Sequence, residues 1–171
     1  ISKDKLTYLF SSAVISKVTS AFGDVVVKYV GENYESSEIP TDAGEYKVIF
    51  SVEGNANYTE LYQEISFTIE KKNVTVPSVN DVTYNGKEFT FVVENELYTI
   101  TNGKGTNVGE YQVILALKDK VNYKWTSSDS ENVTLVVNIL QATNVWSETP
   151  SISKDKWTYG ETSAVISEVT S

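Results

Sequence analysis

The sequence lacks the residue types on which most enzymatic and metal chemistry depends. Among its 171 residues there is no histidine, cysteine, methionine or arginine, and all 14 basic residues are lysines. Without histidine or cysteine the chain cannot form a Ser-His or Cys-His nucleophile or an ordinary zinc site. Without arginine it cannot make bidentate contacts to phosphate or carboxylate groups. We therefore expect a protein that is not an enzyme and that holds no cofactor or metal.

Long apolar runs and positive charge are also scarce. No stretch approaches the roughly 20 apolar residues of a membrane helix. The net charge of −9 disfavours binding to nucleic acid and to anionic lipid. The sequence starts at Ile1 with neither a methionine nor a leader peptide, which indicates an excised fragment of a longer protein. We expect no nucleic-acid partner and no insertion into a membrane.

What the chain does contain is a strand pattern. Hydrophobic residues make up 40% of it, and apolar and polar residues alternate over several short segments. A period of two places the apolar side chains on one face of a β-strand. The pattern is regular at residues 46–52, 65–69, 111–117 and 133–139, and rougher at 25–29 and 89–93. No segment has a sustained apolar stripe with helical spacing, so the predicted class is all-β.

Two internal repeats organise these strands. Residues 152–171 match residues 1–20 at 15 of 20 positions, with an offset of 151. Residues 106–123 match residues 41–58 at 8 of 18 positions, with an offset of 65. The simplest interpretation is two related domains, residues 1–70 and 71–140, followed by a linker and the start of another first-type domain at 141–171.

Turn signals between the strands favour small antiparallel β-sandwiches of the immunoglobulin-like type. Residues 40–44 and 105–109 each end in a glycine before a long strand, where a positive φ is expected, with Asp42 or Asn107 bonding the turn. Asn85-Gly86 predicts a two-residue hairpin. A mixed, β-grasp-like arrangement is the structural alternative.

Domains of about 70 residues bury little surface, and these have no disulfide or metal to add stability. Packing against neighbouring repeats would compensate, so we expect a rod rather than a flexible string of beads. The fragment at 152–171 is expected to add to an exposed sheet edge or to extend the linker.

The residues also resemble a known group of repeats. The motif P-T-D-A-G-E-Y-K-V, followed by N-Y-T and F-T-I, runs from Pro40 to Ile69, and W-T-Y-G-E follows at Trp157 to Glu161. It is similar to the MBG-type and related immunoglobulin-like repeats of bacterial cell-surface adhesins, especially of Firmicutes. The resemblance implies an extracellular, cell-surface or wall-attached parent protein of Gram-positive type. It offers no catalytic residues to transfer.

Two functions follow as hypotheses. In the first, the chain is a structural stalk or adhesin-like repeat module whose partners are neighbouring repeats of the same chain. In the second, it binds a host glycan, mucin or polysaccharide through exposed aromatic residues, and tandem copies add avidity. Trp125, Trp146 and Trp157 are the candidate sugar-stacking residues, although tryptophans that pack the core or the domain junctions explain the pattern more simply.

Three further motifs favour ordinary structural roles. Acidic clusters at 32–38 and 127–131 could hold calcium but lack the glycine-spaced alternation of a dedicated loop, so solvated surface loops are expected. Lys72 and Asn138 have the residue types of an intramolecular isopeptide bond, but alternation places Asn138 away from the core. The glycosylation sequons at Asn57, Asn73 and Asn132 are attributed to chance.

Overall fold

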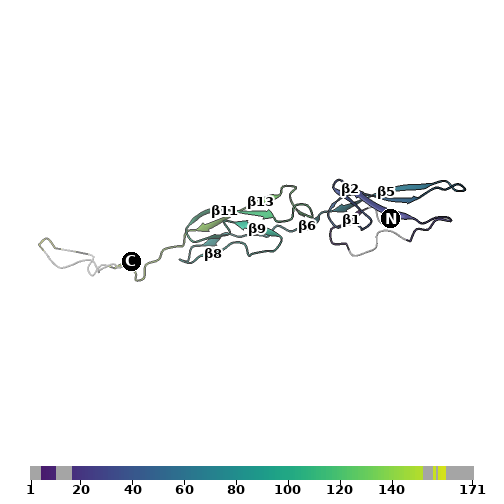
Figure 1. Cartoon of the computed structure of the whole chain (residues 1–171). Coiled ribbons are helices and arrows are strands. Elements are labelled where there is room, and N and C mark those ends of the chain that lie inside the picture. The colour runs from purple at the N-terminus through teal and green to yellow at the C-terminus, as the bar shows by residue number, and fades with distance from the viewer. Residues whose placement is uncertain (1–4, 11–16, 152–155, 157, 161–171) are drawn as a thin grey trace.

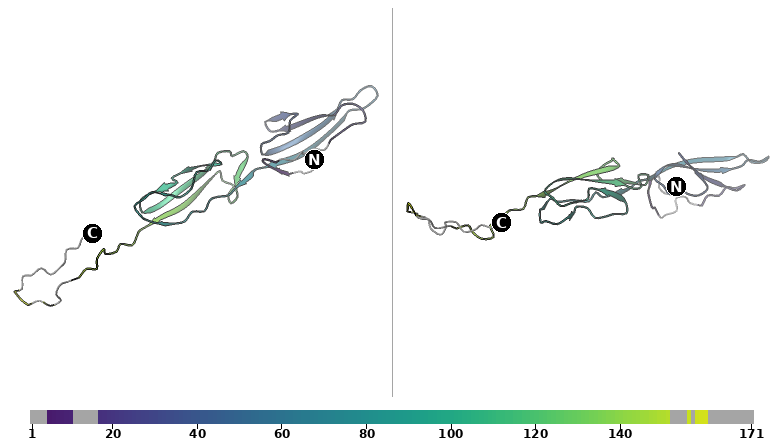
Figure 2. Two further views of the ribbon diagram at one scale, coloured as in Figure 1. Left: turned by 90° about the horizontal axis from the view of Figure 1, so that it is seen from below. Right: turned by 60° about the vertical axis from the view of Figure 1, so that its left-hand side comes forward.

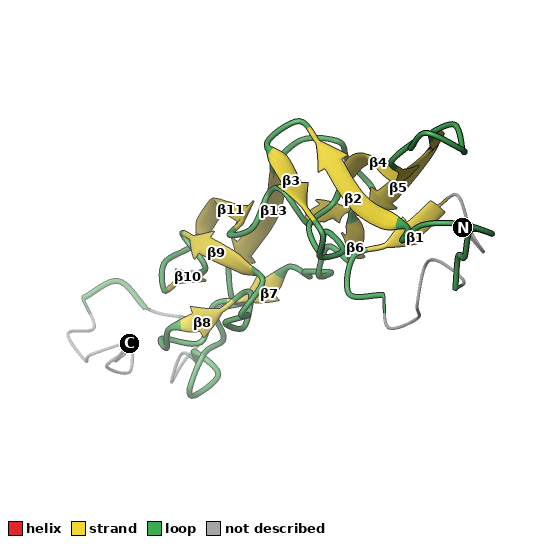
Figure 3. Ribbon diagram, turned by 45° about the vertical axis from the view of Figure 1, so that its right-hand side comes forward, coloured by secondary structure: helices red, strands yellow, loops and turns green. Residues whose placement is uncertain are grey.

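The structure is a computed structural model that describes residues 5–10, 17–151, 156 and 158–160. These residues form thirteen strands and no helix, which confirms the all-β class (Figures 1 and 3). The strands fall into two groups that lie end to end in Figure 1 and in both views of Figure 2. We call them the N-terminal region, residues 5–70, and the C-terminal region, residues 72–140.

One five-stranded sheet makes up the N-terminal region. Its strands are β1 (Lys5–Thr7), β2 (Val26–Gly31), β3 (Tyr34–Ser36), β4 (Gly44–Val52) and β5 (Leu61–Glu70), in the order β1-β5-β4-β2-β3. Strand β4 is central and pairs with β5 along its full length, from Gly44↔Ile69 to Val52↔Leu61. Alternation places Val48, Phe50 and Val52 in the core, as the sequence predicts.

The C-terminal region divides its strands among three sheets. The main sheet has the order β7-β13-β11-β9, built from β7 (Val82–Thr83), β9 (Tyr98–Thr101), β11 (Gly109–Leu117) and β13 (Asn132–Leu140). Two small sheets pair β8 (Phe89–Thr90) with β10 (Lys104–Gly105), and β6 (Lys72–Val74) with β12 (Tyr123–Trp125). A separate hydrophobic core surrounds Val113, Leu115 and Val137.

The favoured antiparallel arrangement does not extend to three short strands, which pair in parallel. Strand β1 pairs in parallel with β5, β7 with β13, and β6 with β12. The sheets are therefore mixed. Each of these entering strands is short, and alternation alone carries no information on the direction of the partner strand.

Two local predictions also fail. Asn85-Gly86 makes a turn in which Asn85 Oδ1 accepts from the Lys87 amide, and Gly86 has φ +78°, but β7 and β8 do not pair into a hairpin. Residues 91–93 are not a strand, and Val93 is 78% exposed. Of the two glycines that open the long strands, Gly109 has a positive φ and Gly44 does not.

A tyrosine at the start of each long strand closes the preceding turn. Tyr46 Oη donates to the Asp42 carbonyl at 3.0 Å, and Tyr111 Oη donates to the Asn107 carbonyl at 2.8 Å. The two pairs are related by the 65-residue offset. Each bond thus ties the tyrosine ring to the backbone four residues upstream and fixes the turn before the strand.

We expect Tyr46→Phe and Tyr111→Phe each to lower the free energy of unfolding by about 1 kcal/mol, because each removes one hydroxyl bond and keeps the packed ring. Urea unfolding followed by circular dichroism measures this. Tyr84→Phe is the control, since the described residues offer its hydroxyl no hydrogen-bond partner. Equal midpoints for all three variants would show that the two hydroxyl bonds contribute nothing.

Candidate functional site

The principal polar contact between the two regions is made by Asn122, in the loop after β11. It is 6% exposed and is the one buried polar residue of the described chain. Its side-chain oxygen accepts from the Ala43 backbone amide at 2.7 Å, and its side-chain nitrogen donates to Asp42 Oδ1 at 3.0 Å. A single side chain therefore bonds to two residues that lie 79 and 80 positions earlier in the chain.

Asp119 holds Asn122 in position from within the same loop. Asp119 Oδ2 accepts from Asn122 Nδ2 at 2.9 Å, while Oδ1 accepts from the backbone amides of Val121 at 3.1 Å and Asn122 at 3.0 Å. An aspartate that bonds the backbone two and three residues on makes a tight local turn. Both side-chain polar groups of Asn122 are satisfied, as burial requires.

Further contacts surround Asn122 and complete what we call the Asn122 junction. The rings of Tyr8 and Tyr123 meet edge to face, with centroids 5.3 Å apart. Lys71 Nζ donates to the Lys120 carbonyl at 2.6 Å, and the Lys72 amide donates to the Asn122 carbonyl at 2.8 Å. Together with the bonds to Asp42 and Ala43, these contacts fix the connection between the regions at residues 70–72.

The titratable groups of the junction reflect this packing. Burial alone would raise the pKa of Asp119, but hydrogen bonds from Asn122 and Val121 and the charge of Lys71 lower that pKa overall. Burial is the main cause that raises the pKa of the Tyr8 phenol, and Tyr123 and Asp119 add to it. Asp119 therefore accepts these bonds as a carboxylate at neutral pH.

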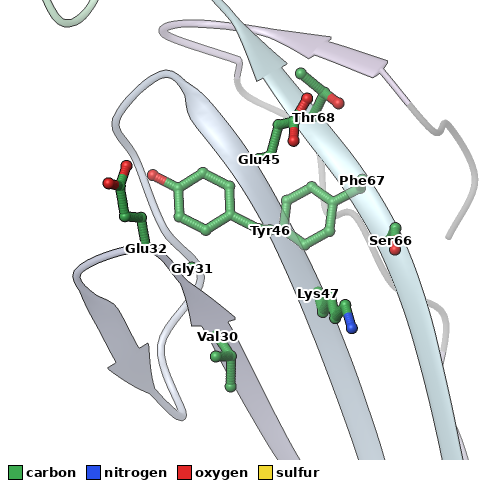
Figure 4. A pocket seen from close by; sticks show the side chains of 9 residues that line it. All are labelled: Val30, Gly31, Glu32, Glu45, Tyr46, Lys47, Ser66, Phe67 and Thr68. Carbon is green, nitrogen blue, oxygen red and sulfur yellow. The ribbon is translucent and has the colours of Figure 1, made fainter.

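A second candidate site is a shallow groove of about 520 Å³ in the N-terminal region, beside the end of β2. The rings of Tyr46 and Phe67 lie side by side in it, with centroids 5.6 Å apart, and the carboxylates of Glu32 and Glu45 border them (Figure 4). The Tyr46 ring covers Gly31, where an added Cβ would lie 2.6 Å from the ring. Aromatic rings beside carboxylates can bind a sugar, but Tyr46 also has a structural task here.

The three candidate tryptophans are not brought together as a platform. Trp125 is 2% exposed, packs against Tyr98 and donates its indole N–H to the Glu131 carbonyl at 3.2 Å. It has no free face for a sugar, and it packs in the core of the C-terminal region. Trp146 is 68% exposed in the segment after β13. Trp157 lies outside the described residues, as does most of the 152–171 fragment whose edge pairing was predicted.

The acidic clusters do not form a metal site. The described residues contain no group of three or more acidic, histidine or cysteine side chains that could hold an ion. In the two clusters, Glu35 pairs with Lys28, and Glu131 pairs with Lys120 at 2.6 Å.

The part of the chain that the structure describes has no helix that could cross a membrane.

The isopeptide candidates lie apart. Lys72 is exposed in β6, which pairs with β12, whereas Asn138 lies in β13. The Asn138 side chain donates to Asp81 Oδ1 at 3.1 Å, and its backbone amide donates to the same oxygen at 2.8 Å. Asn138 thus anchors the loop before β7.

Sequence reasoning aligned Asn122 with Asn57 in the 65-residue repeat but gave it no role. A local difference exists, because Asp119 bonds Asn122 whereas the residue aligned with Asp119 is Gly54, but the partners at Asp42 and Ala43 lie in a distant turn before β4. Comparison of the chain with models of known protein families, with characterised proteins and with solved structures gives no match.

We expect Asn122→Ala to loosen the junction, since it leaves the Ala43 amide without its acceptor and costs about 1–3 kcal/mol. The absence of native cysteine allows spin labels at Gln63→Cys and Gln112→Cys, one in each region. Double electron–electron resonance should give one narrow distribution of distances between the two labels in the parent chain and a broad one in the variant.

Asn57→Ala is the matched control, because Asn57 is exposed at the equivalent position of the first repeat. An unchanged, narrow distance distribution in Asn122→Ala would mean that this side chain does not hold the two regions together.

Proposed function

We propose that the chain is a stiff structural spacer: two tandem immunoglobulin-like β-domains, residues 1–70 and 71–140, followed by the start of a third. The Asn122 junction is the observation that carries this proposal. A flexible linker between independent domains is exposed and makes few contacts. Here the connection is a single residue, Lys71, between β5 and β6, and it is bounded by a buried, fully bonded amide.

Two other features support tandem immunoglobulin-like domains. Each region has its own hydrophobic core. A tyrosine hydroxyl bonds the carbonyl four residues upstream in each region, at Tyr46 and Tyr111. In each region a short strand near the start pairs in parallel with the last long strand, β1 with β5 and β7 with β13, so one edge of each main sheet is parallel.

The proposed setting is outside the cell, on a surface protein attached to the wall of a Gram-positive bacterium. The sequence resemblance to adhesin repeats supports this setting, and the 151-residue repeat fits an extended array. In such an array the partners of each domain are the neighbouring repeats of the same chain, and the unit performs no catalysis. Its task is to hold a distal part of the parent protein away from the cell.

Small-angle X-ray scattering tests stiffness directly. We expect the full chain to scatter as two bodies at one fixed separation, because the junction holds the regions end to end. Insertion of four glycines between Lys71 and Lys72 gives the control, in which the two regions move independently and the pair-distance distribution is broad. Scattering from the parent chain that matches this control would remove the reason to regard the chain as a spacer.

The groove beside β2 favours a second candidate, a module that binds a glycan, mucin or polysaccharide. Its aromatic and acidic lining supports this alternative, which differs from a tryptophan platform. A glycan array should then show saturable binding that Glu32→Gln with Glu45→Gln reduces at least tenfold. Glu94→Gln with Glu96→Gln, two exposed acids of the C-terminal region, is the matched control. No binding across the array would reject this alternative.

A further inference from the structure

The free end of the N-terminal region, opposite the Asn122 junction, exposes an apolar cluster. The rings of Phe22 and Tyr58 stack there, with centroids 3.9 Å apart, and both are substantially exposed. Beside them is an open pocket of about 270 Å³, which we call the end pocket. Its lining includes Val18, Phe50, Val52, Leu61 and Tyr62.

A second apolar feature is exposed at the opposite end of the described chain. After β13, the segment Thr143-Asn-Val-Trp146 leaves Val145 77% and Trp146 68% exposed. Exposed clusters of this kind usually mark a contact surface. In Figures 1 and 2 the chain after β13 leaves the C-terminal region on the side away from the N-terminal region, so this segment is far from β4 and β5, which line the end pocket.

The C-terminal region shows what such a segment does once its own domain follows. Lys72-Asn-Val74 leaves β5 as β6, pairs in parallel with β12, and buries Val74 in the C-terminal core. Thr143-Asn-Val145 follows β13 after Gln141 and Ala142, forms no strand, and repeats the Asn-Val pair. Val74 follows Ile69 by five residues, and Val145 follows Ile139 by six. A proline follows each valine, at Pro77 and Pro150.

The receiving surfaces correspond as well. Val74 belongs to one core cluster with Leu115 and Leu117 at the end of β11. The 65-residue offset aligns these two leucines with Phe50 and Val52 at the end of β4, and both of these line the end pocket. Among the described residues, no strand pairs with residues 53–60 beside that pocket in the way that β6 pairs with β12.

A tryptophan is present at both sites, but on opposite partners: on the receiving strand at one site and on the entering segment at the other. In the C-terminal region the receiving strand supplies Trp125, and the entering segment has Thr75 after its valine. At the other site, the residue aligned with Trp125 is Glu60, and the entering segment has Trp146 after its valine. Each pairing thus contains one tryptophan.

We propose that Thr143–Trp146 of one copy docks into the end pocket of the next copy, so that each first-type domain is completed by the last residues of the preceding 151-residue unit. The partner is a second copy of this chain, joined end to end. Val145 takes the place against Phe50 and Val52 that Val74 takes against Leu115 and Leu117. This inference rests on the tandem array of the proposed function and names the contact that joins its units.

The near-identity of residues 1–20 and 152–171 allows a direct test. In a tandem chain, residues 1–151 of one copy run directly into a complete second copy, which keeps the given sequence across the join as far as Lys156, since Ile1–Lys5 and Ile152–Lys156 are identical. The first copy's segment 143–146 then faces an end pocket, and the second copy's identical segment does not. Joining also raises the effective concentration of the two surfaces to the millimolar range, so a weak contact would still form.

Hydrogen exchange with mass spectrometry compares the two segments in the same molecule. Peptides that continue to Leu6 after the join, or to Trp157 at the second site, have different masses. We expect amides 143–146 of the first copy to exchange at least tenfold more slowly than those of the second. Equal exchange rates would overturn the proposal.

Variants on each side of the contact make the result specific. Val145→Asp in the first copy, or Leu61→Asp in the second, should abolish the protection. Val93→Asp should leave it intact, since Val93 is 78% exposed and belongs to neither surface. Protection that survives both contact variants would mean that the segment is ordered by something other than the end pocket.

The outcome is separable from that of the spacer function, because stiffness at Asn122 is measured within one copy and docking between two. A flexible Asn122 junction with a protected segment would reject the spacer and keep the docking. Fast exchange, combined with glycan binding that Leu61→Asp removes, would instead assign the end pocket to carbohydrate.

Discussion

A buried side-chain amide must find hydrogen-bond partners for both of its polar groups, and Asn122 finds them in two loops, the turn before β4 and its own loop after β11. Leaving even one such group unpaired costs about 1–3 kcal/mol, a large share of the stability of a small domain. The arrangement of Asp42, Ala43 and Asp119 around this amide is therefore cooperative: displacing one region from the other breaks several bonds at once. The end-to-end order of the two regions depends on this constraint.

The same constraint explains why an all-β chain without disulfides can still be extended. Each region has a small core, and the sequence contains no cysteine that could cross-link it. Contacts at the ends of the regions, such as the edge-to-face pair of Tyr8 and Tyr123, extend the buried surface beyond each core. In a repeat array, stability is then shared between units and the interfaces that join them. The exposed cluster at Phe22 and Tyr58 is consistent with this, because the docking proposed above would place a neighbouring unit beside it.

Alternation predicted the central strands well because one face of each is buried by its own core. Val48, Phe50, Val113 and Leu115 are buried where a period of two places them. Alternation failed at residues 91–93, where Val93 is exposed, and the turn signal at Asn85-Gly86 failed as a hairpin because it joins strands that pair elsewhere. In these loop-rich stretches the partner of each strand is chosen by distant residues, which a local pattern does not contain.

The sequence by itself determined the strand class, the two repeat offsets and the long strands that open with Gly-Glu-Tyr, since each depends on local spacing and composition. Only the tertiary structure decided that Trp125 is core, that the entering strands pair in parallel and that Asn122 joins the two regions. Asn122 and Asn57 align in the repeat, yet one is buried and bonded while the other is exposed. Asp119, which aligns with Gly54, gives Asn122 a local partner, but the bonds to Asp42 and Ala43, 80 and 79 positions away, are created only by folding.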